Sequence, residues 1–277
     1  MTVLQGILYG VLQGITEFLP VSSSGHLALA QNIFGAGNIE SDRLTFTVLL
    51  HLGTLAAVLA VYRKDVWLMI KGFFTLLRKL FTGKIREGLD KGEKLFLLVF
   101  IATLPLIAAV PLEDKVEYIS SVCWAVGLLL ILNGFMLFAA DKFSQSRLDM
   151  ESASPKHALI PGFMQILGVF PGISRSGSTV TGGLIAGFSK EDAVKISFLM
   201  SIPAIGGANI LKIKDLYNDP IPASELPAVL CGIAAAVISG LAAIKLLQYM
   251  AKNKKLSAFS YYCFAVGAAA IIYDIIT

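Results

Sequence analysis

The stretch Gln13-Gly-Ile-Thr-Glu-Phe-Leu-Pro-Val-Ser-Ser-Ser-Gly-His26 places a carboxylate, three serines and an imidazole inside an apolar N-terminal segment. An apolar helix is expected over residues 1–18, and Pro20 must end it because proline lacks an N–H and clashes with the preceding turn. A short second helix should follow from Ser24 to Phe34. Two spans would need about 20 residues each, so we predict that residues 1–34 form a re-entrant helical hairpin. Its non-helical turn needs protein or water around it.

The rest of the chain has the composition of a protein that resides in lipid. Of its 277 residues, 56% are hydrophobic and 15% are charged, and the mean hydropathy is +0.74. Soluble domains carry about 25% charged residues. The apolar runs lack the alternation of a β-barrel. We predict an all-α polytopic membrane protein with six transmembrane helices, at Leu44–Tyr62, Leu95–Leu112, Ser121–Ala140, Ala193–Leu211, Leu226–Met250 and Ser257–Ile276.

Charged residues between these spans indicate the topology. Residues 63–94 contain nine lysines and arginines, which places this segment in the cytoplasm by the positive-inside rule. Within it, residues 66–81 space large apolar side chains at helical intervals between basic ones, so we expect an amphipathic helix at the membrane interface, with a short span as the alternative. The acidic segment 113–119 is expected to be a loop on the outside.

A second stretch, Pro171-Gly-Ile-Ser-Arg-Ser-Gly-Ser178, repeats the pattern of the first. At a constant offset of 152 positions, residues 10–59 match residues 162–211 at eleven of fifty positions without a gap. We therefore predict one membrane domain, 1–277, made of two repeats. Residues 1–140 hold the hairpin 1–34, three spans and the helix 66–81, whereas residues 157–277 hold a hairpin at 158–188 and three spans. Because three is odd, the second repeat is inverted, and inverted repeats with broken helices form binding sites near the midplane.

The polar residues of the first motif suggest acid–base chemistry. Glu17 is the only acidic residue among the first 39, and an ionisable group at bilayer depth is a functional candidate by default; the alternative is a residue at headgroup level. Gln13 lies four positions earlier, on the same helical face. His26 indicates acid–base or nucleophilic chemistry. A hydroxyl-rich turn that opens a helix is typical of an anion site or of an N-cap, and this turn consists of Ser22, Ser23, Ser24 and Gly25.

The second motif supplies the fixed cation. Arg175 has no acidic neighbour in the chain before Glu191, and its planar guanidinium suits phosphate oxygens. The alternative is an ion pair with Glu17 across the two hairpins. His51, in the middle of the first span, is expected to form a helix–helix hydrogen bond. Nucleic-acid signatures are lacking. The residues expected to surround the anion on this side are Ser174, Ser176, Gly177 and Ser178.

The two motifs together resemble the signatures of bacterial undecaprenyl-diphosphate phosphatases, the bacitracin-resistance family, over essentially the whole chain. The resemblance implies hydrolysis of the C55 isoprenyl diphosphate to the monophosphate lipid carrier of cell-wall synthesis. It also implies a plasma-membrane location, an active site that opens to the outer face, and stimulation by divalent cations. Contacts with membrane lipids and a homodimer are compatible with it. By position, the resemblance implies that the catalytic residues are Glu17, Ser23, His26 and Arg175.

Two positions depart from the commonest family pattern. Gln13 stands at the first acidic position, which leaves Glu17 as the sole carboxylate, so Mg²⁺ or Ca²⁺ would be held by Glu17 together with the substrate phosphates. Ser24 stands where threonine is common. Ser23 is expected to attack the terminal phosphorus or to orient a water, and the base and acid roles of Glu17 and His26 stay undivided. The alternative function is a lipid-phosphate transporter or flippase that uses the same anion site.

Overall fold

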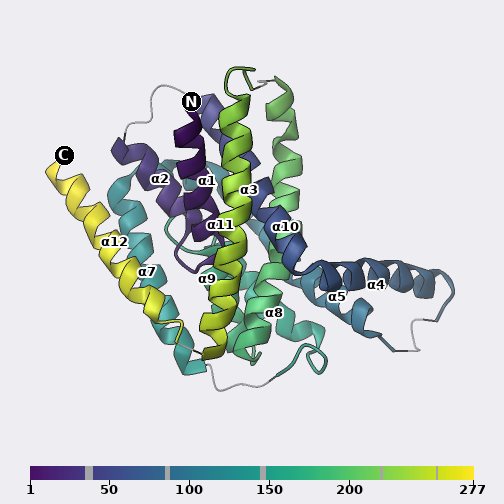
Figure 1. Cartoon of the computed structure of the whole chain (residues 1–277). Helices are drawn as coiled ribbons and strands as arrows, with labels where there is room; N and C mark the ends of the chain where they lie inside the picture. The colour runs from purple at the N-terminus through teal and green to yellow at the C-terminus, as the bar shows by residue number, and fades with distance from the viewer. Residues whose placement is uncertain (35–39, 85–87, 144–147, 219–220, 254) are drawn as a thin grey trace.

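The computed structural model describes residues 1–34, 40–84, 88–143, 148–218, 221–253 and 255–277, and these residues are almost entirely helical (Figure 1). The only β contact among them is an isolated bridge between Leu148 and Phe188. The predicted all-helical class is therefore confirmed. Most helices run along one direction of the bundle, while one pair projects sideways from it.

Each of the two segments predicted as hairpins contains two helices separated by a break, and we keep the name hairpin for each pair; its re-entrant placement in a membrane stays a prediction. The first consists of α1 (Val3–Phe18) and α2 (Ser23–Phe34), and the second of α8 (Pro155–Leu167) and α9 (Arg175–Ile185). The first break falls at Pro20, as expected, because α1 ends two residues earlier. The second break lies between Leu167 and Arg175 and contains Pro171 and Gly172, where the sequence predicted it.

In the part of the chain that the structure describes, five segments are long and apolar enough to cross a membrane: Lys91–Ser120, Cys123–Phe143, Lys190–Ile210, Leu226–Asn253 and Ala258–Ile276. They contain α5 (Lys91–Thr103), η2 (Leu104–Leu112), α6 (Glu113–Ser120), α7 (Cys123–Ala140), η3 (Asp141–Phe143), α10 (Lys190–Asn218), α11 (Leu226–Asn253) and α12 (Ala258–Ile276). They correspond to five of the six predicted spans. The sixth lies in α3 (Glu40–Val61), whose part from Phe46 onward meets the same criterion only together with α4 (Arg63–Phe81).

The loop expected at 113–119 is instead the helix α6. Its first turn carries Glu113 and Asp114. Acidic side chains at this end of a helix interact favourably with the helix dipole. The acidic character that suggested a solvated loop therefore also favours the start of a helix.

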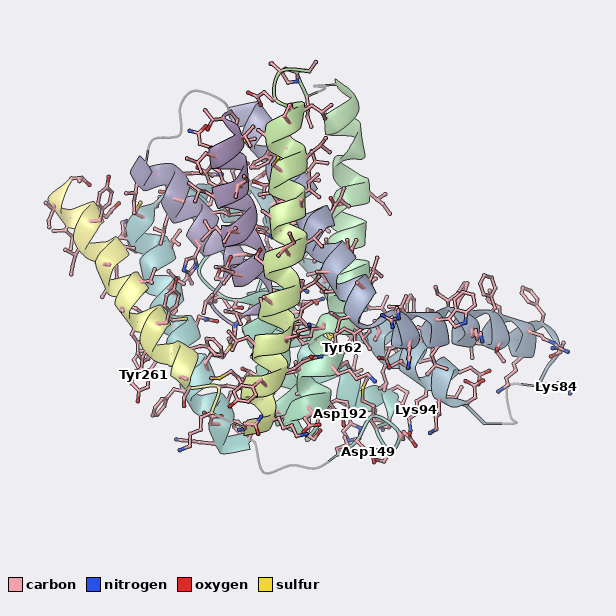
Figure 2. All side chains as sticks on the ribbon, in the orientation of Figure 1. Tyr62, Lys84, Lys94, Asp149, Asp192 and Tyr261 are labelled. Carbon is pink, nitrogen blue, oxygen red and sulfur yellow. The ribbon has the colours of Figure 1, made fainter. Side chains whose placement is uncertain are left out.

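The helix α4 bends 87° away from α3 and projects from the bundle with α5 beside it (Figures 1 and 2). We call this pair the arm; in Figure 2, Tyr62 marks its base and Lys84 its tip. Its two helices approach closely where Gly72 meets Gly92, since a Cβ on Gly72 would lie 2.1 Å from the Gly92 carbonyl carbon. The predicted helix 66–81 lies within α4, and its placement at a membrane surface stays a prediction.

Glycines set the tightest helix contact in the bundle, between α1 and α11. A Cβ on Gly6 would lie 2.2 Å from the Ala228 carbonyl oxygen, and one on Gly10 would lie 2.1 Å from the Gly232 carbonyl oxygen. Backbones that approach this closely are typical of membrane helices that associate through small residues. In the same way α8 packs on α5, where Gly162 faces Ala102. The first helix of each hairpin therefore packs on a helix from the other half of the chain.

Candidate active site

The two hairpin breaks meet in the interior of the bundle and are joined by hydrogen bonds. Ser22 Oγ accepts the Gly172 N–H at 3.0 Å, and Ser176 Oγ donates to the Leu19 carbonyl at 3.1 Å. Asn133 on α7 joins them again: its Nδ2 donates to the Pro20 carbonyl at 2.9 Å, and its Oδ1 accepts the Ser174 N–H at 3.0 Å. Buried backbone N–H and C=O groups need hydrogen-bond partners, and these contacts provide them at both breaks.

The first break turns into α2 at Ser22, which has a positive φ of 71°. Such a conformation is uncommon for a residue with a side chain. The side chain of Ser22 compensates by accepting the Gly25 N–H at 3.2 Å, as an N-cap does. Gly25 itself lies against the other break, because a Cβ there would be 2.8 Å from the Gly172 nitrogen. A side chain at residue 25 would push the two hairpins apart.

The second break enters α9 in a parallel manner. Ser174 is the N-cap, and its Oγ accepts the Gly177 N–H at 3.1 Å. Ser178 Oγ donates back to the Ser174 carbonyl at 2.8 Å. The hydroxyls of Ser174 and Ser176 lie 3.0 Å apart. Arg175 is the first residue of α9, so its backbone N–H belongs to the helix start, where N–H groups lack intrahelical acceptors.

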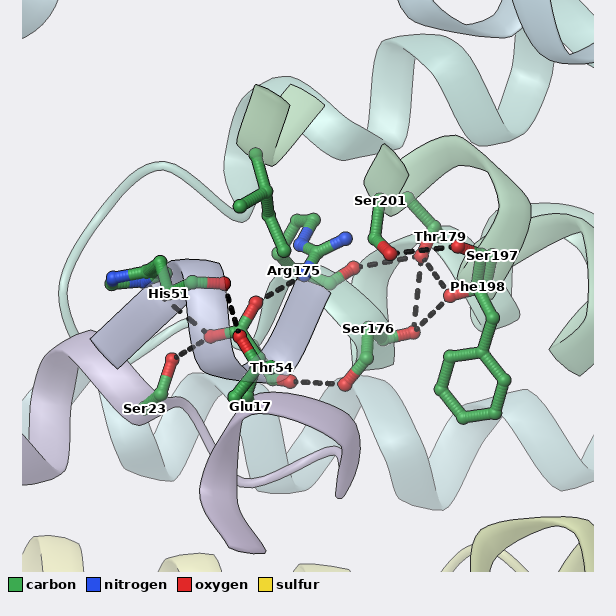
Figure 3. Close-up of polar contacts among 12 residues, drawn as sticks. Glu17, Ser23, His51, Thr54, Arg175, Ser176, Thr179, Ser197, Phe198 and Ser201 are labelled. Atoms are coloured by element: carbon green, nitrogen blue, oxygen red, sulfur yellow. Dashed lines mark hydrogen bonds and ion pairs between the residues drawn. The ribbon is translucent and has the colours of Figure 1, made fainter. Parts of the chain in front are cut away.

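Glu17, at the end of α1, is the centre of the site (Figure 3). Its Oε1 forms an ion pair with the guanidinium of Arg175. Its Oε2 accepts Ser23 Oγ at 2.7 Å and Gln13 Nε2 at 3.0 Å. The Glu17 side chain is only 5% exposed, whereas that of Arg175 is 16% exposed. A carboxylate, a hydroxyl and a guanidinium from two hairpins are thus brought into direct contact.

The structure contains the ion pair named as the alternative for Arg175, and phosphate binding by the same guanidinium stays a prediction. The guanidinium has an acidic partner across the hairpins, so the expectation of an unpaired cation is wrong. The reason is that Glu17 and Arg175 lie 158 positions apart, beyond the range of any local pattern. A buried charge that is left without a partner is strongly unfavourable, and Glu17 is the partner the fold provides.

His51 on α3 also lies at this centre, contrary to the expected helix–helix hydrogen bond. Its Nδ1 contacts the Thr47 carbonyl of its own helix at 2.7 Å. Its Nε2 lies 3.6 Å from Glu17 Oε2 (Figure 3). Position 51 has no partner at helical spacing that would have indicated this contact from the sequence.

His26 lies on α2 but makes different contacts from those expected of it. Its Nδ1 lies 2.7 Å from the Ser22 carbonyl oxygen, and its Nε2 lies 2.8 Å from the hydroxyl of Tyr262 on α12. Among the described residues, none of its hydrogen bonds or ion pairs reaches Glu17 or Ser23. Ser23 and His26 still share a face of α2, because residues three apart in a helix are neighbours.

The predicted anion-binding hydroxyls divide into two groups. One group is buried and engaged in the contacts between and within the hairpins: Ser22, Ser174, Ser176 and Ser178. The other group is reachable from outside, since Ser24 is exposed and Ser23 is partly exposed. Gln13 is fully buried and donates a hydrogen bond to Glu17. The backbone carbonyl of Arg175 accepts a hydrogen bond from the Thr179 hydroxyl. The Thr179 hydroxyl in turn lies 2.6 Å from the Ser197 hydroxyl (Figure 3).

The described residues do not fit a resident divalent cation. They contain no group of three or more His, Cys, Asp or Glu side chains that could hold a metal ion. Both oxygens of Glu17 already face donors, namely Arg175 on one side and Ser23 with Gln13 on the other. Mg²⁺ and Ca²⁺ need several oxygen ligands, and one engaged carboxylate is not such a set.

Comparison with known proteins places the chain in a family. The sequence model of the family described as "Bacitracin resistance protein BacA" matches residues 6–269. The chain is 40% identical over 278 residues to an "Undecaprenyl-diphosphatase" of Alkaliphilus metalliredigens, with 100% of both chains covered. It is 39% identical to a protein of the same name from Methanobrevibacter smithii, with 96% of each covered, and 35% identical to one from Geobacter sulfurreducens, with 99% of this chain and 98% of the other covered. The chain therefore belongs to the bacitracin resistance protein BacA family.

Proposed function

We propose that this protein hydrolyses undecaprenyl diphosphate to undecaprenyl phosphate and inorganic phosphate, and so recycles the lipid carrier for cell-wall synthesis. The observation that carries the proposal is the contact of Ser23 Oγ with the Glu17 carboxylate beside Arg175. A hydroxyl hydrogen-bonded to a base, with a cation next to it, is the arrangement that nucleophilic attack on a phosphate needs. The names of the relatives support the same substrate and reaction.

In the proposed first step, the terminal phosphate of the substrate takes the place of Glu17 at the guanidinium of Arg175. Ser23 Oγ attacks the terminal phosphorus as its proton passes to Glu17 Oε2. The bond from that phosphorus to the bridging oxygen breaks, and undecaprenyl phosphate leaves. Arg175 and the N–H groups at the start of α9 stabilise the charge on the transferring phosphoryl group, where most of the catalytic effect of such sites lies.

In the second step, water attacks the phosphorus of the phosphoserine and gives up a proton to His26, which passes it to solvent. The bond from phosphorus to Ser23 Oγ breaks as Glu17 returns its proton to Ser23, and inorganic phosphate leaves. We assign an acid–base role in this step to His26, which shares a face of α2 with Ser23. His51, 3.6 Å from Glu17, is assigned a hydrogen bond to the substrate phosphate or to Glu17. The alternative first step, in which Ser23 and Glu17 orient a water directly, differs by forming no phosphoserine.

The purified protein in detergent provides the test, because no membrane side or gradient exists there. We expect phosphate release from the C55 diphosphate, and its loss in Ser23→Ala and Glu17→Gln. Ser121→Ala changes an exposed serine at the end of α6 and should keep the wild-type rate. A transporter or flippase would release no phosphate in detergent; the relatives, all named for a phosphatase, do not favour that alternative.

We propose that the divalent cation, Mg²⁺ or Ca²⁺, arrives bound to the diphosphate rather than residing in the protein. The lack of a metal-ligand cluster among the described residues supports this. Equilibrium dialysis of ⁴⁵Ca²⁺ should then show stoichiometric binding only when a non-hydrolysable diphosphate lipid is present. Binding of one cation per chain without that lipid would contradict the proposal.

We further propose six spans and two re-entrant hairpins in an inverted repeat, with the site open to the outer face of the plasma membrane. Reciprocal packing of α1 on α11 and of α8 on α5 supports the repeat. Helix α4 would lie along the cytoplasmic surface, because it bends 87° from α3 and exposes Trp67, Phe74 and Phe81 beside basic residues such as Lys71. Labelling of cysteines introduced at Ser24 and Lys84 from either side of sealed vesicles tests both placements. A homodimer stays a prediction that cross-linking in membranes can test.

A further inference from the structure

We propose that Tyr262 is a positioning residue of the active site, which fixes the ring of His26 and the nitrogen on which that ring carries its proton. The inference rests on the proposed function, because it concerns the acid–base role assigned there to His26. The two residues lie 236 positions apart in the chain, on α12 and α2, so their contact is a product of the fold.

The hydrogen bonds of His26 determine its tautomer. The Ser22 carbonyl, 2.7 Å from Nδ1, can only accept, so Nδ1 carries a proton. In the neutral ring Nε2 is then an acceptor, and the Tyr262 hydroxyl at 2.8 Å donates to it. A histidine whose second nitrogen is held in this way keeps one tautomer and one orientation.

Packing fixes the ring as well as the proton. The rings of His26 and Tyr262 are stacked, with centroids 5.5 Å apart and planes inclined by 8°. His26 is 8% exposed, whereas Tyr262 is 46% exposed. Tyr262 is therefore accessible at the surface, whereas the imidazole is buried. Because Nδ1 is engaged by the backbone of Ser22, proton transfer by His26 has to use Nε2, the nitrogen that Tyr262 holds.

The neighbouring tyrosine provides a matched control. Tyr261 lies on the outer side of α12 (Figure 2) and is 68% exposed. Tyr262→Phe removes one hydroxyl and keeps the stacked ring, and Tyr261→Phe makes the same chemical change away from the site. The melting temperatures of the two variants should agree.

Steady-state hydrolysis of the C55 diphosphate in detergent tests the role. We expect Tyr262→Phe to lower kcat about tenfold, the effect of misplacing one catalytic group by a single hydrogen bond, with KM unchanged within about twofold. Tyr261→Phe should leave both constants unchanged. In a His26→Gln background, Tyr262→Phe should cause no further loss. A wild-type kcat in Tyr262→Phe, or an added loss in the His26→Gln background, would overturn the proposal.

The ring nitrogens of His26 can be observed directly. The chain has three histidines, so ¹⁵N-histidine labelling gives few signals, and His→Gln variants assign them. We expect Nδ1 of His26 to be protonated and Nε2 to shift from a hydrogen-bonded to a free acceptor in Tyr262→Phe. An unchanged Nε2 signal would overturn the inference. Failure of the proposed function itself is a different result, namely no phosphate release by the wild-type protein, and the nitrogen signals still decide the role of Tyr262.

Discussion

The turns at residues 22–26 and 174–178 are built alike and differ at two positions. In each turn the first serine accepts the N–H of the glycine three residues later, at 3.2 Å in one and 3.1 Å in the other. In each turn, the hydroxyls at the first and third positions lie near each other. Those of Ser22 and Ser24 are 3.4 Å apart, and those of Ser174 and Ser176 are 3.0 Å apart. The shared residues are those that shape the turn and join the hairpins.

The residues that differ are those assigned to the chemistry. At equivalent positions, 152 apart, Ser23 corresponds to Arg175 and His26 corresponds to Ser178; Glu17 corresponds to Val169. The first hairpin thus supplies the hydroxyl, the carboxylate and the imidazole, and the second supplies the cation. The two turns share a pattern of hydrogen bonds, although the first serine has a φ of 71° in one and −76° in the other. In the proposed function, the few positions that differ make the two helix starts complementary around one ligand.

The largest effect is expected from removing the cation. Arg175→Ala should lower kcat by about 10³-fold or more, as for other arginines that stabilise a transferring phosphoryl group. Phosphate release by the purified variant is the measurement. Arg78→Ala, on the arm, removes a charge of the same sign away from the site and should be active. Wild-type turnover by a folded Arg175→Ala protein would show that the reaction does not need the cation of the second hairpin.

The second largest loss of activity is expected at Ser23, the position of the first hairpin that is equivalent to Arg175. Ser23→Ala removes the hydroxyl bonded to Glu17 and should lower kcat by about 10²- to 10⁴-fold, the usual contribution of such a group. Ser24→Ala, one residue further, should keep the rate within a few-fold, because among the described residues its hydroxyl has a single hydrogen-bond contact, with that of Ser22 at 3.4 Å. Equal losses in both variants would show that the turn binds phosphate without a specific nucleophile.

The two turn glycines are expected to differ in their effect on stability. A Cβ at Gly25 would lie 2.8 Å from backbone at Gly172, whereas one at Gly177 would lie 3.1 Å from the Ser174 side chain. Gly25→Ala should reduce the free energy of unfolding by about 1–3 kcal/mol, as overpacking does, and Gly177→Ala should reduce it by less. Thermal unfolding in detergent compares them. A larger loss of stability in Gly177→Ala than in Gly25→Ala would mean that the first hairpin accommodates an added methyl group more readily than the second.

The smallest effects on activity and stability are expected from substitutions at two equivalent glutamines, Gln13 and Gln165. Gln13 donates to Glu17 at 3.0 Å, but both amide atoms of Gln165 are buried without a hydrogen-bond partner among the described residues. An unsatisfied buried polar group costs about 1–3 kcal/mol. Gln165→Leu should therefore leave activity unchanged and stability unchanged or slightly higher, whereas Gln13→Leu should reduce activity. Chemical denaturation and phosphate release measure the two effects, and a strongly destabilised Gln165→Leu would show that the amide has a bound water or ligand.

Much of this arrangement follows from the sequence, because its causes are local. Proline and glycine mark both breaks, and the offset of 152 pairs the two turns. The repeat predicted that the motifs with Glu17 and Arg175 face each other, and the family resemblance singled out Ser23. The helix at 113–120 was not anticipated, because acidic residues suit the first turn of a helix as well as a solvated loop.

Two further residues, His51 and Tyr262, were not predicted as site residues because their roles depend on packing between helices. His51 and Tyr262 reach the site from α3 and α12, and neither lies in a motif. His51 was assigned to ordinary helix packing, and Tyr262 is one of several aromatic residues in an apolar span. Their roles come from contacts with Glu17 and His26 over 34 and 236 positions of the chain, respectively, and such contacts leave no local pattern.

The ion pair between Glu17 and Arg175 also bears on how the protein is made. A single ionised side chain at bilayer depth costs roughly 2.5–3.5 kcal/mol on insertion scales, and here two opposite charges offset each other. Until both hairpins are in the membrane, each motif enters with an uncompensated charge or a neutralised one. The first hairpin should therefore reach its final packing only when the second hairpin, whose Arg175 lies 158 positions after Glu17, has been synthesised. In the chain truncated after residue 140, the three spans should hold the protein in the membrane, while the first hairpin should be less protected from protease than in the full-length protein.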